Sequence, residues 1–325
     1  MRLSNNTVKK FFKGAIYFSE DKGYLTPYRY SKAQLDYMAD ESYDYGWRFR
    51  AKFSGGIRME LKTDAKNISF DYRASDAHET SNTLDLYIND VLFKVYHIEN
   101  RLKGRVEYNN LPKGEKKVTI YFPCESKLEI KNFTLDGGYK SIKDKKEKVL
   151  VIGDSITQGA GPAIASSAYL NALTRKTNYN YLGQGVGGYR YEAKDLMRIE
   201  GFEPDKIIVF LGTNYYEEAC LKSCNYDYAR AVKEFYEVLN TMYPKTPVLS
   251  ITPLWRNNDV DMNRLLWCVD TIKNECSRYD NIIVADGFTL VPNVDECFSD
   301  RVHPNAYGSE LLANNIVKFM KENKF

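Results

Sequence analysis

The hydrophobic pattern of the chain changes near residue 145, and this change limits the folds that it can adopt. Before it, short runs such as Asn67–Tyr72 alternate polar and apolar residues with a period of two. After it, continuous apolar runs, the first of which is Val149–Ile152, alternate with segments of helical periodicity. Alternation is typical of antiparallel strands with one solvated face, whereas continuous runs are typical of strands covered on both faces. The sequence therefore predicts two domains, residues 1–146 and 147–325.

The first domain is expected to be an antiparallel β-sandwich of a jelly-roll-like kind. Its predicted strands are rich in aromatic and β-branched residues, and turn residues separate them. They are Trp47–Phe53, Gly56–Lys62, Asn67–Tyr72, Leu84–Ile88, Leu92–Tyr96 and Lys117–Phe122.

The second domain is expected to be α/β, with a doubly wound parallel sheet of the flavodoxin-like kind. Its predicted strands are Val149–Ile152, Lys206–Leu211, Pro247–Ile251 and Asn281–Ala285. The predicted helices are residues 168–177, 192–200, 226–242, 261–279 and 306–322. Because ligands of such sheets bind at the carboxyl ends of the strands, functional residues are expected there.

Composition excludes several classes of partner. Lys and Arg number 46 and Asp and Glu 43, which gives a net charge of +3. The sequence has no basic tract interleaved with aromatic residues, which is the pattern that would indicate nucleic-acid binding. No apolar stretch approaches the roughly 18 residues that a membrane helix needs, so no membrane contact is expected. The densest charge run, Lys140–Lys148, is interpreted as a solvated linker. The oligomeric state is left open.

The cysteines favour a reducing environment. They are Cys124, Cys220, Cys224, Cys268, Cys276 and Cys297, and their spacing forms no regular disulfide framework. With only three histidines in the chain, we expect no metal site and no cofactor. Residues 1–16 carry no apolar run long enough for a signal peptide. These observations predict a cytoplasmic protein with free thiols.

Polar residues at two strand ends are candidates for catalysis. Ser155 directly follows the first apolar strand, although Asp154 and Ser155 could instead simply cap a helix. Asp300 and His303 are three residues apart, so that the carboxylate can hold one imidazole nitrogen while the other accepts a proton from a serine. Since the other two histidines lie in the first domain, His303 is the expected general base.

Two further strand ends offer hydrogen-bond donors. Gly183–Gly188 provides backbone N–H groups that a substrate oxygen can approach closely, and Asn214 provides a neutral amide. Each segment could also be a plain turn. Gly183–Gly188 matches the dinucleotide fingerprint G-x-G-x-x-G, but it does not follow the first strand of the parallel unit, where that fingerprint belongs.

Together these segments resemble the sequence blocks of the SGNH (GDSL-type) hydrolases. Gly153–Ile156 resembles the first block, Gly185–Gly188 the second, Gly212–Asn214 the third and Asp300–His303 the fifth. The resemblance implies a serine esterase with a Ser-His-Asp triad. Ser155 would be the nucleophile, His303 the base and Asp300 the acid. The oxyanion donors would be Ser155, Gly188 (with Gly187 as the alternative) and Asn214. Tyr215 departs from the Asp that usually follows the third block.

The first domain is similar to that of two-domain acetyl esterases of carbohydrate esterase family 2. Phe53–Asp64 and Leu84–Tyr87 carry this looser resemblance, which implies removal of O-acetyl groups from xylo- or manno-oligosaccharides. Trp255, at a strand end, is a candidate for stacking on a sugar ring or for plain packing. The alternatives are a short-chain lipase or thioesterase and, outside the enzymes, a carbohydrate-binding protein.

Overall fold

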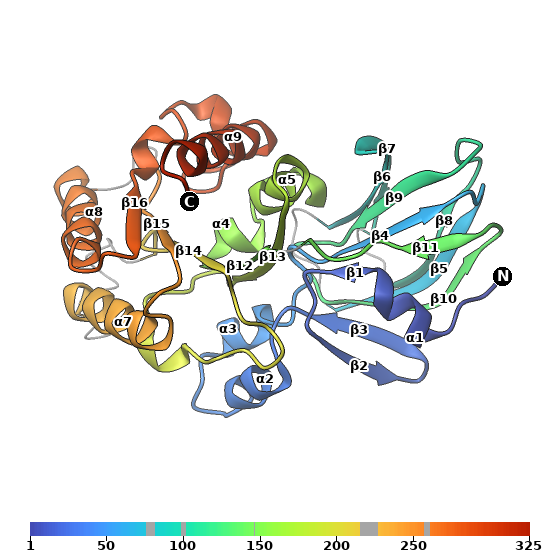
Figure 1. Ribbon diagram of the computed structural model, residues 1–325, viewed down its shortest axis with the longest axis horizontal. Coiled ribbons are helices and arrows are strands. Elements are labelled where there is room, and N and C mark those ends of the chain that lie inside the picture. The colour runs from blue at the N-terminus through green and yellow to red at the C-terminus, as the bar shows by residue number, and fades with distance from the viewer. Residues whose placement is uncertain (76–81, 99–101, 146, 215–226, 257–260) are drawn as a thin grey trace.

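The computed structural model describes residues 1–75, 82–98, 102–145, 147–214, 227–256 and 261–325. Two antiparallel sheets form most of the N-terminal half, and one five-stranded parallel sheet with helices forms the C-terminal half. Figure 1 shows the two antiparallel sheets on the right and the α/β part on the left.

The antiparallel sheets pack face to face around one apolar core. The first sheet has the order β1 (Phe12–Lys13), β4 (Arg58–Thr63), β9 (Lys116–Tyr121), β6 (Thr83–Ile88) and β7 (Val91–His97), with β11 (Tyr139–Ser141) on β4. The second has the order β2 (Tyr17–Asp21), β3 (Tyr24–Tyr28), β10 (Leu128–Leu135), β5 (Ile68–Ala74) and β8 (Lys103–Tyr108). Side chains of both sheets, such as Leu61 and Phe70, share the core. The short elements α1 (Asn5–Val8) and η1 (Lys9–Phe11) precede β1.

The expectation that Trp47–Phe53 forms a strand is wrong. The chain instead forms two helices, α2 (Lys32–Met38) and α3 (Tyr45–Arg50), between β3 and β4. The Asp44 side chain accepts a hydrogen bond from the backbone N–H of Trp47 and so caps the start of α3. Trp47 is then buried in the core beneath the parallel sheet rather than in the sandwich. Tertiary packing and a cap therefore override the alternating pattern.

The parallel sheet has the order β13 (Tyr179–Gly185), β12 (Glu147–Gly153), β14 (Lys206–Phe210), β15 (Val248–Ile251) and β16 (Ile282–Ala285). All four strand pairings are parallel. Helices α5 (Tyr169–Lys176) and α9 (Ala306–Glu322) cover one face. Helices α7 (Tyr228–Met242) and α8 (Met262–Cys276), together with α2 and α3, cover the other. The predicted parallel sheet with helices on both faces is therefore confirmed.

Shorter helical elements complete the α/β part. They are α4 (Ser155–Gln158), η2 (Ala165–Ser167), η3 (Ala193–Asp195), η4 (Gly287–Thr289) and η5 (Asp295–Cys297). The helix expected over residues 192–200 is wrong, because only η3 is helical there. The Asp195 carboxylate accepts hydrogen bonds from the hydroxyls of Tyr43 and Tyr189, and these contacts hold the segment in an irregular path.

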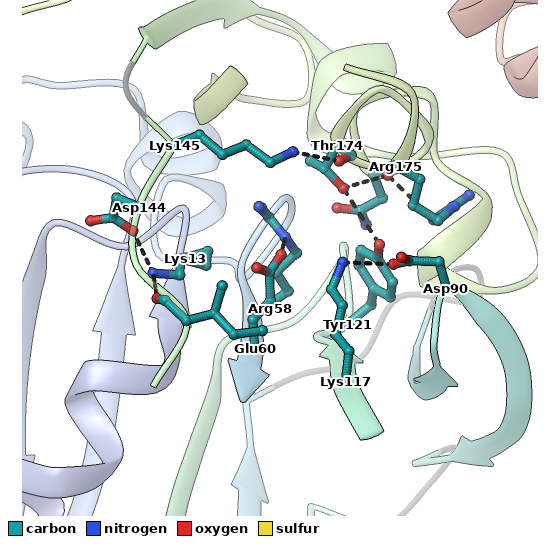
Figure 2. Close-up of polar contacts among 12 residues, drawn as sticks. Lys13, Arg58, Glu60, Asp90, Lys117, Tyr121, Asp144, Lys145, Thr174 and Arg175 are labelled. Carbon is teal, nitrogen blue, oxygen red and sulfur yellow. Dashed lines mark hydrogen bonds and ion pairs between the residues drawn. The ribbon is translucent and has the colours of Figure 1, made fainter. Parts of the chain in front are cut away.

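Polar contacts join the sandwich to the α/β part (Figure 2). The Lys145 ammonium donates to the carbonyl oxygens of Thr174 and Thr177 at the end of α5, at 3.0 and 2.7 Å. Thr83 and Asp85 of β6 accept from backbone N–H groups at the start of η2. The run Lys140–Lys148 is thus more than the predicted solvated linker, since it also contributes to β11 and β12.

A buried arginine joins the two parts at the end of β13. Arg29 is 0% exposed. Its guanidinium donates to Phe53 O at 2.9 Å and Arg50 O at 2.9 Å on the N-terminal side. It also donates to the carbonyl oxygens of Gly183 and Gly185 in β13. A buried cation is tolerated when its donors are satisfied, and here backbone carbonyls of both parts of the chain satisfy them.

We expect Arg29→Met to lower the free energy of unfolding by several kcal/mol. A buried acceptor left without its donor costs about 1–3 kcal/mol, and this substitution removes the donor to four carbonyls. Urea unfolding of the variant and of Arg48→Met would measure the difference. Arg48 is a control on α3, where its side chain donates to Ala39 O and Asp40 O and lies over the Tyr45 ring. Equal stability of the two variants would contradict the role given to Arg29.

Candidate active site

Ser155 lies at the carboxyl end of β12 and begins α4. The preceding Asp154 caps this short helix, because its side chain accepts from the backbone N–H of Ile156 at 3.0 Å. Gly153 allows this sharp entry, since a Cβ there would lie 2.0 Å from Thr157 Oγ1. The helix-cap interpretation therefore applies to Asp154, while the Ser155 side chain stays partly exposed at the edge of the sheet.

His303 meets Ser155 across 148 residues of sequence. The Nε2 atom of His303 lies 2.7 Å from Ser155 Oγ, and Nδ1 lies 2.7 Å from Asp300 Oδ2. The second Asp300 oxygen accepts from the backbone N–H groups of Val302 and His303, each at 2.7 Å. The carboxylate thus fixes both the loop and the ring, and the three predicted side chains form one hydrogen-bonded chain.

The Asp300 carboxylate is held in its charged form. Partial burial raises its pKa, but the hydrogen bonds from the His303 ring and from the backbone of His303 and Val302 outweigh burial and hold the pKa well below its usual range. An ionised Asp300 favours the tautomer of His303 that carries its proton on Nδ1. In that tautomer Nε2 is an acceptor directed at Ser155.

The expected oxyanion donors follow the two strands that flank β12. Gly188, after β13, has a φ of +79°, in the left-handed region that favours glycine. The alternative donor Gly187 already donates its N–H to Gln158 Oε1 at 2.8 Å, which favours Gly188. After β14, the Asn214 amide donates to Tyr189 O at 3.0 Å. Since that bond uses one N–H, the amide has a second one to offer a substrate.

These residues line one open cleft of about 300 Å³. Its described lining is Arg50, Glu125, Ser155, Gln158, Ala160, Gly187, Gly188, Asn214, Arg256, Val302 and His303. Arg50 and Glu125 come from the N-terminal half, so both halves of the chain form the cleft. Sequence reasoning missed Arg50, Glu125 and Arg256, and no motif around them marks their position.

Trp255 is not among the described residues that line this cleft. Its indole stacks on Phe288, with ring centroids 4.1 Å apart, and its Nε1 donates to Phe288 O at 2.8 Å. The geometry gives Trp255 a packing role, which is the alternative that the sequence left open. The neighbouring Arg256 reaches the cleft instead, where it donates to Thr213 O at 3.1 Å.

The described part of the chain offers no group of three or more His, Cys, Asp or Glu side chains that could hold a metal ion. Within the same part, no helix is both long and apolar enough to cross a membrane.

Burial raises the pKa of Asp154 to about 7, against opposing effects from the Ile156 N–H and from His303. The folded protein therefore binds this proton more tightly than the unfolded chain, in which the carboxyl titrates near its ordinary value of 3.8. As the pH rises between these two values, folding loses stability because the buried carboxyl must ionise.

We expect Asp154→Asn, which keeps a capping side chain, to abolish this loss. Between pH 5 and pH 8 the stability of the variant relative to the wild type should rise by about 2–3 kcal/mol, at about 1.4 kcal/mol per pKa unit. Urea unfolding of both proteins at both pH values measures this change in relative stability. The contributions of the other titrating groups cancel in the difference between the two proteins. Parallel pH profiles of the two proteins would be the contrary result.

Comparisons with known proteins agree with this geometry. Residues 151–311 match the model of the GDSL-like lipase/acylhydrolase family. No curated protein sequence matches the chain significantly.

Among solved structures, a Bacteroides ovatus protein described as a GDSL-like lipase has a TM-score of 0.77 and 19% identity, over 96% of this chain and 94% of that one. The salicylyl-acyltransferase SsfX3 of a tetracycline biosynthetic pathway has a TM-score of 0.72 and 18% identity, over 96% and 94%. A family two carbohydrate esterase of Cellvibrio japonicus has a TM-score of 0.62 and 16% identity, over 99% and 97%. At these identities the likeness concerns the fold. The family match places residues 151–311 in the GDSL-like lipase/acylhydrolase family of the SGNH superfamily, and the protein is a carboxylic ester hydrolase.

Proposed function

We propose that this protein is a serine esterase that removes O-acetyl groups from carbohydrates, with Ser155, His303 and Asp300 as its triad. The observation that carries the proposal is the hydrogen-bonded chain from Ser155 Oγ through the His303 ring to Asp300 Oδ2, with 2.7 Å at each contact. A serine, a base and an orienting carboxylate at these distances form the arrangement that activates a hydroxyl nucleophile.

In the proposed reaction, Ser155 Oγ attacks the ester carbonyl carbon while His303 Nε2 takes the hydroxyl proton. The backbone N–H groups of Ser155 and Gly188 and the Asn214 amide stabilise the oxyanion. His303 then returns the proton to the leaving sugar oxygen, which leaves an acyl group on Ser155. Water activated by the same nitrogen releases the acid and restores the serine.

The lining of the cleft supports a short acyl group on a polar alcohol. Ala160 and Val302 supply its only apolar side chains among the described residues, and the others offer charges, amides and backbone N–H groups. A lipase or thioesterase for long acyl chains would need an extended apolar groove. Similarity of fold to a family two carbohydrate esterase over nearly the whole chain also supports a sugar ester.

We further propose that the enzyme acts in the cytoplasm on acetylated oligosaccharides. Cys124, Cys268, Cys276 and Cys297 are free and buried, as is usual for proteins of a reducing compartment. Cys220 and Cys224 lie outside the described residues.

A panel of substrates tests the proposed function. We expect acetylated xylo- or manno-oligosaccharides to be hydrolysed with a higher kcat/KM than p-nitrophenyl acetate. We expect butyryl and octanoyl esters to have a lower kcat/KM, because the described lining of the cleft gives a long acyl chain little apolar surface. Ser155→Ala is the control, and it should lose several orders of magnitude in kcat, since removing any triad member leaves little more than the oxyanion hole and binding. Faster cleavage of octanoyl esters, with acetylated sugars no better than p-nitrophenyl acetate, would favour a lipase or thioesterase.

A further inference from the structure

Arg50 of α3 lines the catalytic cleft without a carboxylate partner in the described structure. Its side chain donates a hydrogen bond from Nη1 to Gly187 O at 3.3 Å, and within the described part of the chain Nε and Nη2 form no hydrogen bond or ion pair. A guanidinium has five N–H donors in a rigid fork, so most of the donors of Arg50 are available to a ligand.

The position of this guanidinium is fixed from two sides. The Arg50 carbonyl accepts a hydrogen bond from the buried Arg29 at 2.9 Å, which anchors the end of α3. The side-chain stem lies against Gly187, where an added Cβ would come within 2.9 Å of Arg50 Cδ. Trp47, on the same helix, packs edge-on against Tyr189, with ring centroids 5.0 Å apart. Because the fork is held in place beforehand, little side-chain entropy is lost when it binds a ligand.

Other charged residues of the described lining are Arg256 and Glu125. Arg256 adds a second guanidinium, held at Thr213 O beside the expected oxyanion donor Asn214. Glu125 is the carboxylate of the described lining, and the Asp300 carboxylate is already bound to His303. Arg50 is thus a cation of the described lining with open hydrogen-bond donors, and it can attract and bind an anionic substrate.

We propose that Arg50 forms an acid-sugar subsite, so that the preferred substrate is an acetylated oligosaccharide that carries a uronic acid near the acetyl group. Arg50 Nε and Nη2 donate to the sugar carboxylate as a charge-assisted pair. This proposal rests on the proposed function, because it names the class of sugar whose ester the enzyme cleaves. It makes Arg50 a determinant of substrate choice rather than a participant in the acyl transfer.

A matched pair of substrates tests the subsite. The two are acetylated oligosaccharides of equal length and acetyl position, one with a uronic acid and one with the corresponding neutral hexose. We expect the wild type to prefer the acidic substrate by about 10–100-fold in kcat/KM, the range for hydrogen bonds to a charged group, with the difference mainly in KM. In Arg50→Gln the ratio should fall close to one. Arg50→Lys should give an intermediate ratio, since it keeps the charge without the fork.

Arg48→Gln is the control, because Arg48 also lies on α3 but contacts Ala39 O, Asp40 O and the Tyr45 ring. It should keep the wild-type ratio. The Tm of each variant shows whether it is folded. If Arg50→Gln does not fold, two other measurements take its place: the ratio for Arg50→Lys, and the loss of the wild-type preference at 0.5 M salt. At that ionic strength, charge attraction is screened within about 4–5 Å. A wild type that prefers the neutral substrate, or an unchanged ratio in folded Arg50→Gln, overturns the subsite while the acetyl esterase activity stands.

A second measurement separates this inference from the proposed function. Free uronic acid should inhibit the hydrolysis of p-nitrophenyl acetate competitively and more strongly than the neutral hexose, and Arg50→Gln should remove the difference. If neither acetylated sugar is cleaved but uronate still inhibits through Arg50, the proposed function fails and the anion subsite remains. Equal inhibition by the acid and the neutral sugar overturns the subsite.

Discussion

The buried guanidinium of Arg29 is the contact on which the geometry of the cleft depends. It joins the carbonyls of Phe53 and Arg50, where α3 ends, to those of Gly183 and Gly185 in β13. Burial lowers its pKa, so the fold must offer acceptors to a charge that has been removed from water. Since the segment that follows β13 carries Gly187 and Gly188, the bond that joins the two halves also sets the position of the expected oxyanion donors.

The order of strands in the parallel sheet explains why residues far apart in sequence meet. β12 lies between β13 and β14, and Gly153 pairs with Gly185 on one side and with Phe210 on the other. Ser155 therefore emerges between the segments that hold Gly188 and Asn214. His303 arrives from the loop before α9, whose first turn Asn305 caps by accepting from Tyr307 and Gly308.

The sequence allowed prediction of those parts of the site whose signal is local. Ser155 follows a continuous apolar run, and Asp300 and His303 lie within one turn, so strand ends and spacing were enough to place them. Helix α3 was not predictable, because apolar and polar residues alternate after Asp44 as they would in a strand. Packing beneath the parallel sheet stabilises the helix instead. Arg50 reaches Gly187 across 137 residues, and no local pattern records a contact of that kind.

The most direct test of the account is covalent labelling of the nucleophile. A fluorophosphonate that mimics the tetrahedral intermediate should add once per chain, and mass spectrometry of peptides should place the adduct on Ser155. Labelling should slow by orders of magnitude in His303→Asn, because the hydroxyl then has no base at 2.7 Å. An adduct on another residue, or equally fast labelling without His303, would contradict the assignment of Ser155 and His303 as nucleophile and base.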